Sequence, residues 1–293
     1  HDALALSNRL NSIEPVQYSH PNFIVVDPGR LPGYGPSGTP AVCERCAGSV
    51  APAAGQEPLF SGEWHLKNAG GMGKAFADIN ALKAWSISKG SSTVVIAVLD
   101  DRIDLGQEDL AGQIVDPWDA TTGEIMNSGT PLSEFDGHGT AAAGLAAAAT
   151  NGIGIAGVAA KCKIMPIRTH YDGATDILSI AEGIKHAAVS AQVLSMSWTL
   201  ADGSSSIDEI EDALSFAADD KGRVLVFAAG NNQGFAVSYP ASAVSRFPII
   251  AVSATDQWDN LKAISDPKDP CKWGTQFGSY TISAPGVDLY TTD

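Results

Sequence analysis

The amino-acid sequence predicts an α/β protein with a mostly parallel, doubly wound sheet that is flanked by helices. Continuous apolar, β-branched runs recur along the chain, as expected for strands that are buried on both faces. Helical patterns lie between several of these runs, and buried strands that alternate with helices indicate a parallel sheet. The expected strands are residues 92–100, 163–168, 191–198, 223–230 and 247–255.

Besides a helix of small residues that begins at His138, two helices are predicted between these strands. Residues 175–189 form the first and residues 206–220 form the second. In the second, Ser206 and Glu209 have capping-box spacing, which predicts that the helix begins there. Its apolar face is expected to consist of Ile207, Ile210, Leu214 and Ala217.

The first 58 residues differ in character from the rest of the chain. Residues 1–26 combine an amphipathic helical pattern with an extended segment, which predicts a small helix–strand unit. Residues 27–58 are rich in proline, glycine and alanine and are typical of a linker or extended arm. We therefore expect the sheet domain to occupy residues 59–293.

Charge and hydropathy exclude several classes of partner. The 293 residues include 18 Lys and Arg against 33 Asp and Glu, for a formal net charge of −15. Phosphate binding needs a basic surface, so we expect no nucleic acid among the partners. No uninterrupted apolar run approaches the ~20 residues that a membrane-spanning helix needs, so no membrane span is expected.

Four cysteines leave more than one interpretation open. Cys43 and Cys46 form a C-x-x-C pair in a proline- and glycine-rich segment, whereas Cys162 and Cys271 stand alone. A Cys₄ zinc site usually needs a second close pair, and a thioredoxin-like motif should begin a helix after a strand. One or two disulfides in an exported protein is the interpretation we favour, with the pairing left open.

Polar residues stand at the ends of several predicted elements. The first central strand ends at Asp100, another ends at Ser197, and Asn231 follows a third. His138 lies between two glycines and opens a helix made mostly of alanine and glycine. Because sites in doubly wound sheets gather beyond the carboxyl ends of the strands, these residues are expected at one edge of the sheet.

These residue types fit acyl-transfer chemistry. A histidine can take a proton from a hydroxyl and return it to a leaving amine, and a buried aspartate fixes its tautomer. An asparagine amide can donate a hydrogen bond to the oxyanion of a tetrahedral intermediate. Taken singly, each residue also has a structural explanation: the aspartate as a cap, the histidine as part of the core, the asparagine as a turn residue. Their combination and order favour the catalytic interpretation.

The segments around these residues resemble those of the subtilisin-like serine peptidases, the subtilase family. "VVIAVLDDRIDLGQEDL" is similar to the aspartate segment, "DGHGTAAAG" to the histidine segment and "VFAAGNN" to the oxyanion segment of that family. The resemblance covers residues 58–293 and implies a subtilisin-like fold. It also implies that Asp100 is the triad acid, His138 the general base and Asn231 the oxyanion donor.

The resemblance further implies a substrate-binding strand and a calcium site. "VLSMSW" is similar to the strand whose backbone pairs with an extended substrate, and Trp198 and Thr199 are expected to reshape the neighbouring side-chain pockets. The residues implied for substrate binding are Ser195, Met196, Ser197, Trp198 and Thr199. A structural Ca²⁺ would take side-chain oxygens from Asp109 and Asn151 and carbonyl oxygens from Ala149, Ile153 and Ile155. A tight glycine turn without metal is the alternative.

The N-terminal residues are also similar to parts of that family. Residues 1–26 resemble the end of an inhibitory propeptide, and residues 57–68 resemble the beginning of the mature domain in longer members. An independent helix–strand unit is the alternative. The resemblance implies an exported enzyme, secreted or extracellular, with the periplasm as an alternative location.

Two departures from the family pattern affect the functional prediction. The acid segment reads Asp100-Asp101-Arg102, and a second carboxylate could raise one pKa while Arg102 could offset this. The family's serine segment is not found before the sequence ends at Asp293. We therefore expect the serine on a companion C-terminal fragment or in a longer sequence. The alternatives to an active endopeptidase are an inactive subtilase-like binding scaffold and a latent zymogen.

Overall fold

The computed structural model describes residues 57–71, 73–127, 137–169, 176–200, 206–231, 236–263, 274–276, 278 and 281–292. The predicted helix–strand unit, nearly all of the predicted linker, and Cys43, Cys46 and Cys271 lie outside these residues. Within them, no helix is both long enough and apolar enough to cross a membrane. Cys162 is a free, buried thiol, so the two-disulfide interpretation, which requires all four cysteines, is wrong.

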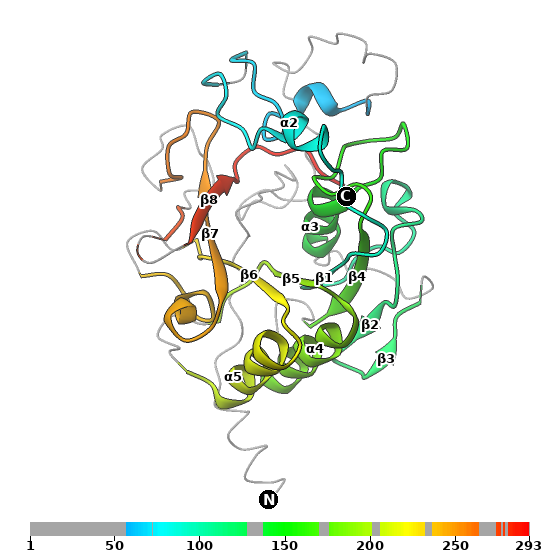
Figure 1. Cartoon of the computed structure of the whole chain (residues 1–293), viewed down its shortest axis with the longest axis vertical. Helices are drawn as coiled ribbons and strands as arrows, with labels where there is room; N and C mark the ends of the chain where they lie inside the picture. Colours follow the sequence, from blue (N-terminus) through cyan, green and yellow to red (C-terminus); the bar gives the residue numbers. More distant parts are fainter. Residues whose placement is uncertain are drawn as a thin grey trace, which may run out of the picture.

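The described residues form an eight-stranded sheet in the order β3-β2-β4-β1-β5-β6-β7-β8 (Figure 1). All neighbours run parallel except the short β2–β3 pair, so the predicted mostly parallel sheet is confirmed. The strands are β1 (Val95–Asp100), β2 (Trp118–Asp119), β3 (Glu124–Ile125), β4 (Lys163–Arg168), β5 (Val193–Met196), β6 (Val224–Ala228), β7 (Ile249–Thr255) and β8 (Ile282–Pro285).

The strand order places β1 at the point where the sheet winds in opposite directions. β1 pairs with β4 on one side and with β5 on the other. The strands β2 and β3 lie beyond β4, whereas β6, β7 and β8 follow outward from β5 in chain order. In a doubly wound sheet, the crevice at such a switch point is the usual binding site. Asp100, the last residue of β1, lies at this place.

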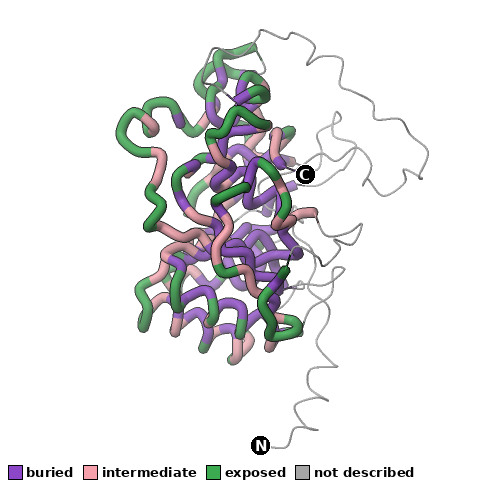
Figure 2. Tube along the Cα trace, turned by 90° about the vertical axis from the view of Figure 1, so that its right-hand side faces the viewer, coloured by how far each residue is buried: buried purple, intermediate pink, exposed green. Residues whose placement is uncertain are grey.

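Helices cover both faces of the sheet, as the alternation of side chains along β1 requires. Ala97 and Leu99 point into a large core with α4 (Ile177–Ser190) and α5 (Asp208–Ser215), whereas Val98 packs with α3 (His138–Ala147) on the opposite face. Figure 1 shows α3 on one side of the strands and α4 and α5 on the other. Buried residues are concentrated in the middle of the molecule (Figure 2).

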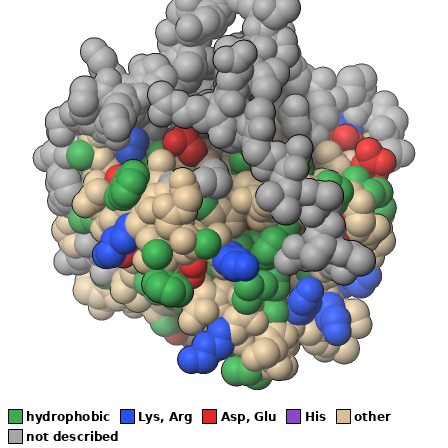
Figure 3. Space-filling model, turned by 90° about the horizontal axis from the view of Figure 1, so that it is seen from above, with side chains coloured by type: hydrophobic (Ala, Val, Ile, Leu, Met, Phe, Trp, Pro, Cys, Tyr) green, Lys and Arg blue, Asp and Glu red, His purple; other side chains and the backbone are tan. Residues whose placement is uncertain are grey.

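Shorter elements complete the described fold. α2 (Ala81–Trp85) lies near the beginning of the described residues, and Phe216–Asp220 continues α5 as a π-helical turn. Three 3₁₀ turns are formed by Phe60–Gly62, Glu108–Leu110 and Ala241–Ser245. Acidic and basic side chains of the described residues are scattered over the face seen from above (Figure 3).

The second predicted helix begins differently from the sequence expectation. α5 begins at Asp208 after an extended Ile207, and no side chain caps it, so the Ser206–Glu209 capping box is wrong. The physical reason is that Ile207 packs against the core while three acidic residues occupy the first turn. Their negative charges stabilise the amides of the helix N-terminus without a capping side chain.

Candidate active site

Asp100 is held at the end of β1 by contacts from both neighbouring strands. Its carbonyl accepts a hydrogen bond from the Thr169 amide, just beyond β4, at 2.9 Å. The carbonyl of Leu99 accepts a hydrogen bond from Trp198 Nε1, just beyond β5, at 2.8 Å. Asp100 is 1% exposed, so its carboxylate is fixed in position within a low-dielectric environment.

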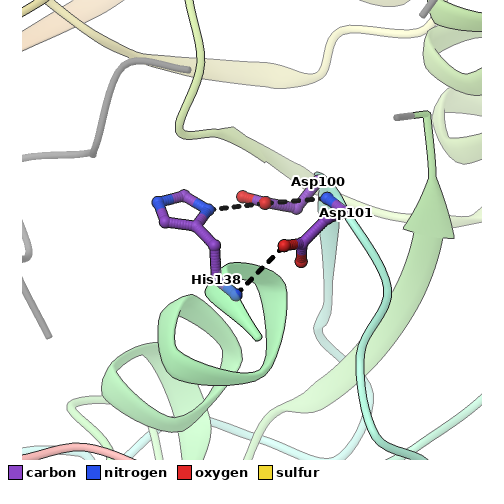
Figure 4. Close-up of side chains that lie close together, drawn as sticks. All are labelled: Asp100, Asp101 and His138. Carbon is purple, nitrogen blue, oxygen red and sulfur yellow. Dashed lines mark hydrogen bonds and ion pairs between the residues drawn. The ribbon is translucent and has the colours of Figure 1, made fainter. Parts of the chain in front are cut away.

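His138 is the first residue of α3, and its imidazole lies against Asp100. His138 Nδ1 and Asp100 Oδ1 are 2.6 Å apart, and the backbone amide of Asp101 donates to the same oxygen at 2.8 Å. Since an ionised carboxylate only accepts, Nδ1 carries the proton of this bond. Figure 4 shows the second ring nitrogen pointing away from both carboxylates. This is the arrangement of a general base that is oriented by an aspartate.

The surroundings of His138 favour its charged form. Burial lowers the pKa of the imidazolium, but the charge of Asp100, its hydrogen bond and the charge of Asp101 together raise that pKa above the ordinary 6.5. A raised pKa means that the environment stabilises the imidazolium relative to the neutral ring. This is the state that a general base adopts during proton transfer.

The carboxylate of Asp101 does not compete with Asp100 for the imidazole of His138. Asp101 is 1% exposed and accepts hydrogen bonds from the amides of His138 at 3.1 Å and Gly139 at 2.5 Å. Arg102 Nη2 donates to the carbonyl of Asn127 at 3.4 Å. Asp101 therefore acts at the N-terminus of α3, where amide groups stabilise a negative charge.

Small residues along α3 allow other backbone and side chains to approach closely. A Cβ on Gly139 would lie 2.9 Å from Asp101 Oδ1, and a Cβ on Gly144 would collide with Thr292 Oγ1. Thr291 Oγ1 donates to the carbonyl of Ala141 at 2.6 Å, and Thr292 Oγ1 donates to that of Thr140 at 2.7 Å. The helix that carries the histidine is thus fixed at its N-terminus and along its flank.

Asn231 lies near the same edge of the sheet as Asp100. It follows β6 after Gly230, whose φ of +107° favours glycine. β6 pairs with β5 and β5 pairs with β1, all in parallel, so the carboxyl ends of the three strands share one edge. The Asn231 carbonyl accepts a hydrogen bond from the Gly274 amide at 3.2 Å.

The predicted substrate segment is placed mostly by core packing. Ser195 and Met196 end β5, and Ser197, Trp198 and Thr199 follow it and are buried. The Trp198 ring is 1% exposed and meets Phe227 edge-on, with 5.4 Å between the ring centroids. The Trp198 indole lies in the core, where Nε1 donates to the buried carbonyl of Leu99. The expectation that Trp198 and Thr199 reshape the neighbouring side-chain pockets stays a prediction.

The residues expected to bind calcium lie in contact with one another. Asp109 Oδ2 accepts from the Ile155 amide at 2.8 Å, the Asp109 carbonyl accepts from the Ala149 amide at 2.8 Å, and Asn151 Oδ1 accepts from Ile153 at 2.9 Å. Asp109 Oδ1 is buried and has no hydrogen-bond partner among the described residues. Burial raises the pKa of Asp109, which the Ile155 hydrogen bond opposes and Glu57 reinforces.

An acid that the sequence analysis missed lies at the same loop. Glu57 is buried, and its Oε2 accepts a hydrogen bond from the Gly152 amide at 2.8 Å. Its position at the boundary of the predicted linker gave no signal of this contact. Buried carboxylates, an orphaned oxygen and a loop with several carbonyls form the hard oxygen environment that suits Ca²⁺.

A second buried carboxylate–imidazole pair was also missed. Glu63 is 0% exposed and His65 is 2% exposed, and the distance from Glu63 Oε1 to His65 Nε2 is 4.0 Å. Glu63 Oε2 accepts from the Ala156 amide at 3.0 Å. Burial raises the pKa of Glu63 to about 8 and lowers that of His65 to about 4, so both groups are neutral near pH 6.

The fold and the Asp100–His138 pair together define a class: α/β proteins that carry an acid–base pair at the carboxyl edge of a parallel sheet. Residues 91–293 match the model of the subtilase family of peptidases, which is more than half of the chain. The chain therefore belongs to the subtilase family.

The similar proteins include a serine proteinase and a calcium-dependent protease. The chain is 37% identical to thermitase of Thermoactinomyces vulgaris, over 73% of this chain and 70% of that protein. It is 33% identical to the thermophilic serine proteinase of a Bacillus species, over 80% of this chain and 54% of the relative. A calcium-dependent protease of a Nostoc species is 35% identical, over 72% of this chain and 34% of that protein. The chain thus spans about half of the length of the Bacillus proteinase and a third of the Nostoc protease.

Solved structures share the fold. A protease from Pseudoalteromonas arctica superposes with a TM-score of 0.62 and 24% identity, covering 78% of this chain and 71% of the other. Fervidolysin from Fervidobacterium pennivorans, described as a keratinolytic enzyme related to subtilisin, superposes with a TM-score of 0.61 and 24% identity, covering 93% of this chain and 37% of the other. The predicted subtilisin-like fold is confirmed.

Proposed function

We propose that the protein is a serine endopeptidase that hydrolyses peptide bonds in protein substrates. The observation that carries this proposal is the 2.6 Å hydrogen bond between Asp100 Oδ1 and His138 Nδ1 at the switch point of the sheet. His138 is the general base, Asp100 fixes its tautomer, and Asn231 donates to the oxyanion. The proposed nucleophile is a serine of the whole protein that His138 Nε2 can reach.

In the proposed reaction, each residue has a defined task. His138 Nε2 takes the proton of the serine hydroxyl as the oxygen attacks the scissile carbonyl, and gives the proton to the leaving amine as the peptide C–N bond breaks. Asp100 stabilises the imidazolium that forms in between. A water molecule, with His138 again as the base, then cleaves the acyl-serine ester, which releases the carboxylic acid product and restores the hydroxyl. The raised pKa of His138 supports this assignment, because the same environment that raises it favours the charged intermediate state.

The substrate is proposed to bind as an extended strand against the backbone of residues 195–199. β5 is paired with a strand on each side, so the main-chain hydrogen bonds to an extended peptide would come from the residues that follow it, Ser197 to Thr199. Such main-chain bonds give affinity, and side-chain pockets add specificity. Burial of Met196 and Trp198 supports a role for the backbone of this segment rather than for these side chains. Ser195, Ser197 and Thr199 complete the segment.

A structural Ca²⁺ is proposed at the loop that contains Asn151. Asp109 and Asn151 would provide side-chain oxygens, and Ala149, Ile153 and Ile155 would provide carbonyl oxygens. The buried, unpartnered Oδ1 of Asp109 and the nearby Glu57 carboxylate support a cation there, since two buried acids without one repel each other. When bound, the ion would supply only electrostatic and structural stabilisation.

The remaining parts of the proposal concern maturation and location. Residues 1–26 are proposed to be the remnant of an inhibitory propeptide, residues 27–58 a linker, and residues 59–293 the catalytic domain. The protein is proposed to be secreted, as an enzyme that meets protein substrates outside the cell. A zymogen of this kind would gain activity after limited proteolysis.

A serine-directed fluorophosphonate probe tests the proposed function in the full-length protein that contains this chain. Labelling is expected after removal of the propeptide, and His138→Ala should abolish it while leaving the fold unchanged by circular dichroism. A companion fragment would appear as a second labelled species by mass spectrometry under denaturing conditions. A folded, matured sample that is not labelled would support an inactive binding scaffold and overturn the proposal. The intact Asp100–His138 hydrogen bond favours the enzyme over the scaffold.

A further inference from the structure

We propose that Asp101 is a positioning residue that fixes the catalytic histidine by clamping the N-terminus of α3 onto the end of β1. The inference rests on the proposed function for its kinetic consequences, and it deepens that function by assigning a task to the unusual second carboxylate. Asp101 does not touch the reacting atoms; it acts through the backbone of His138.

The two consecutive aspartates bind different parts of His138. Asp100 Oδ1 binds the imidazole of His138, and Asp101 Oδ2 accepts from the backbone amide of the same histidine at 3.1 Å. Asp101 Oδ1 accepts from the amide of Gly139 at 2.5 Å. Figure 4 shows the ring and the backbone of His138 held by different carboxylates from one strand end.

Among the described residues, helix α3 has no side-chain cap of its own at the N-cap position. Its N-cap residue is Gly137, and no side chain of the cap position bonds the helix. The first amides of a helix have no intrahelical acceptor and require one from elsewhere. Asp101, which is 37 positions before His138 in the sequence, supplies this acceptor. The contact therefore joins the N-terminus of α3 to the end of β1.

Two further features fit this role. The carboxylate of Asp101 is almost fully buried, and a buried charge persists only where hydrogen bonds or opposite charge compensate it. Gly139 leaves room for the carboxylate, since a Cβ there would lie 2.9 Å from Asp101 Oδ1. Thr140 Oγ1 accepts from the amide of Asp104 at 2.9 Å, which adds a second tie between the same two segments.

The charge of Asp101 also acts on the imidazole. It is one of the contributions that raise the pKa of His138, after those of Asp100. Removing the charge should therefore lower that pKa, and removing the acceptor should loosen the backbone of His138. If Asp101 only stabilised the helix, its removal would leave kcat and the Nδ1 proton signal of the Asp100 bond unchanged.

The test compares Asp101→Ala and Asp101→Asn with a matched control, Asp176→Ala. Asp176 is the local N-cap of α4 and accepts from the amide of Ser179 through Oδ1 at 2.8 Å, but α4 carries none of the proposed catalytic residues. The ring of His138 is titrated by NMR in ¹⁵N-histidine-labelled protein, and kcat and KM are measured for the matured full-length protein. The NMR titration does not require peptidase activity.

Asp101→Ala is expected to lower kcat by about 10²-fold with little change in KM, the size of effect expected when a catalytic group is misplaced by about 1 Å. It should also lower the pKa of His138 and weaken the Nδ1 proton signal of the Asp100 bond. Asp101→Asn keeps one acceptor oxygen and should recover part of kcat but not the pKa. Asp176→Ala should lower the melting temperature without changing either readout.

The outcomes separate this inference from the proposed function. If the wild-type protein has no peptidase activity, the proposed function fails, while the titration still decides the role of Asp101. If both Asp101 variants keep the wild-type His138 titration and Nδ1 signal, Asp101 is only a helix cap and the inference is overturned. If Asp101→Ala does not fold, Asp101→Asn alone decides by the same readouts.

Discussion

Two imidazole–carboxylate pairs in this molecule differ in their state of charge. In the pair Asp100–His138, the interacting atoms are 2.6 Å apart and the pKa of the histidine is raised. In the pair Glu63–His65, the atoms are 4.0 Å apart, the pKa of the histidine is lowered to about 4, and that of the glutamate is raised to about 8. Both pairs are buried, so burial alone does not explain the difference.

The difference comes from what surrounds each carboxylate. Asp100 Oδ1 accepts both the imidazole and the Asp101 amide, and Asp101 adds a second negative charge near the ring. Glu63 accepts one amide, from Ala156, and has the acids Asp109 and Glu57 as neighbours, which disfavour its ionisation. A buried pair ionises only where close geometry and extra hydrogen bonds offset the loss of hydration. The first pair is therefore suited to proton transfer and the second to a neutral structural role.

The largest expected effect is on kcat, which should depend on the Asp100–His138 pair and not on the Glu63–His65 pair. Asp100→Asn in the matured full-length protein should lower kcat by about 10⁴-fold, because an amide NH₂ facing Nδ1 selects the wrong tautomer. Glu63→Gln should leave kcat near the wild-type value at neutral pH, since Glu63 is already uncharged there. Steady-state hydrolysis of a peptide substrate measures both.

Thermal unfolding provides the control for this comparison, because a variant that is unfolded at assay temperature is uninformative. Equal losses of kcat in folded Asp100→Asn and Glu63→Gln would show that the two pairs do not differ in function. That result would contradict the assignment of Asp100 as the orienting acid.

The second prediction concerns the pH dependence of stability. The folded-state pKa of Glu63 is raised from 4.5 to about 8, so its protonated form contributes stability that is complete below pH 4.5 and is lost as pH rises toward 8. Between pH 4.5 and 7 this amounts to on the order of 3 kcal/mol. Glu63→Gln cannot ionise and should flatten this decline, so that the variant is the more stable protein at pH 8. Urea unfolding at pH 5, 6, 7 and 8 measures the slope.

Metal-free samples are required for this measurement, because a cation at the neighbouring loop would change the local field. Asp212→Asn, an exposed substitution on α5, serves as the control and should keep the wild-type slope. An unchanged slope in Glu63→Gln would show that Glu63 does not ionise in this range.

Much of the fold could be predicted from the sequence because buried parallel strands leave a strong pattern. β4 has the predicted bounds Lys163–Arg168, and β1 lies within the predicted 92–100 and ends at Asp100 as expected. β8 (Ile282–Pro285) was missed, since its four residues include proline and are only partly buried. The short β2–β3 pair was missed for a similar reason: two residues per strand leave no periodicity.

The site could be predicted only in part. The position of Asp100 at the end of a predicted parallel strand and of His138 at the start of a helix indicated that the two residues meet. The structure brings them together. The role of Asp101 could not be predicted, because its partners are backbone amides 37 and 38 positions away, and backbone groups leave no trace in sequence. The burial of Trp198 depended on a carbonyl acceptor at Leu99, which only the packed sheet provides.

The third prediction tests whether Ca²⁺ binds beside Asp109 and Glu57, the two acids next to the Glu63–His65 pair. Ca²⁺ at 100 times its Kd should raise the free energy of unfolding by about 2.7 kcal/mol, and a chelator should remove this gain. Asp109→Asn should abolish most of the calcium response, because Asp109 would supply a side-chain ligand, whereas Asp212→Asn should retain it. Differential scanning calorimetry with and without Ca²⁺ measures the shift. Equal calcium responses in the two variants would contradict the proposed site.

The smallest expected effect tests whether close packing of α3 against the C-terminal segment maintains the short distance between Asp100 and His138. Gly144→Ala places a Cβ against Thr292 Oγ1, so α3 or the C-terminal segment must move. Overpacking costs about 1–3 kcal/mol, and alanine recovers about 0.5–1 kcal/mol of helix propensity, so a net loss of about 1 kcal/mol is expected. Since α3 carries His138, the displacement should also weaken its hydrogen bond with Asp100 and lower its pKa toward that of an ordinary histidine.

A double-mutant cycle with Thr292→Ala sharpens this last test. Thr292→Ala removes the two closest contacts of the new Cβ and also the bond to the Thr140 carbonyl, and it leaves the contact with Thr291 Oγ1 at 3.0 Å. The two substitutions should therefore couple, and the double variant should lose less than the sum of the single losses. Gly71→Ala, where a Cβ meets nothing within 4 Å, is the matched control and should leave stability and the His138 titration unchanged. Additive losses from Gly144→Ala and Thr292→Ala would show that the C-terminal segment does not hold α3 in place. The short Asp100–His138 distance would then depend on the contacts at the strand end alone.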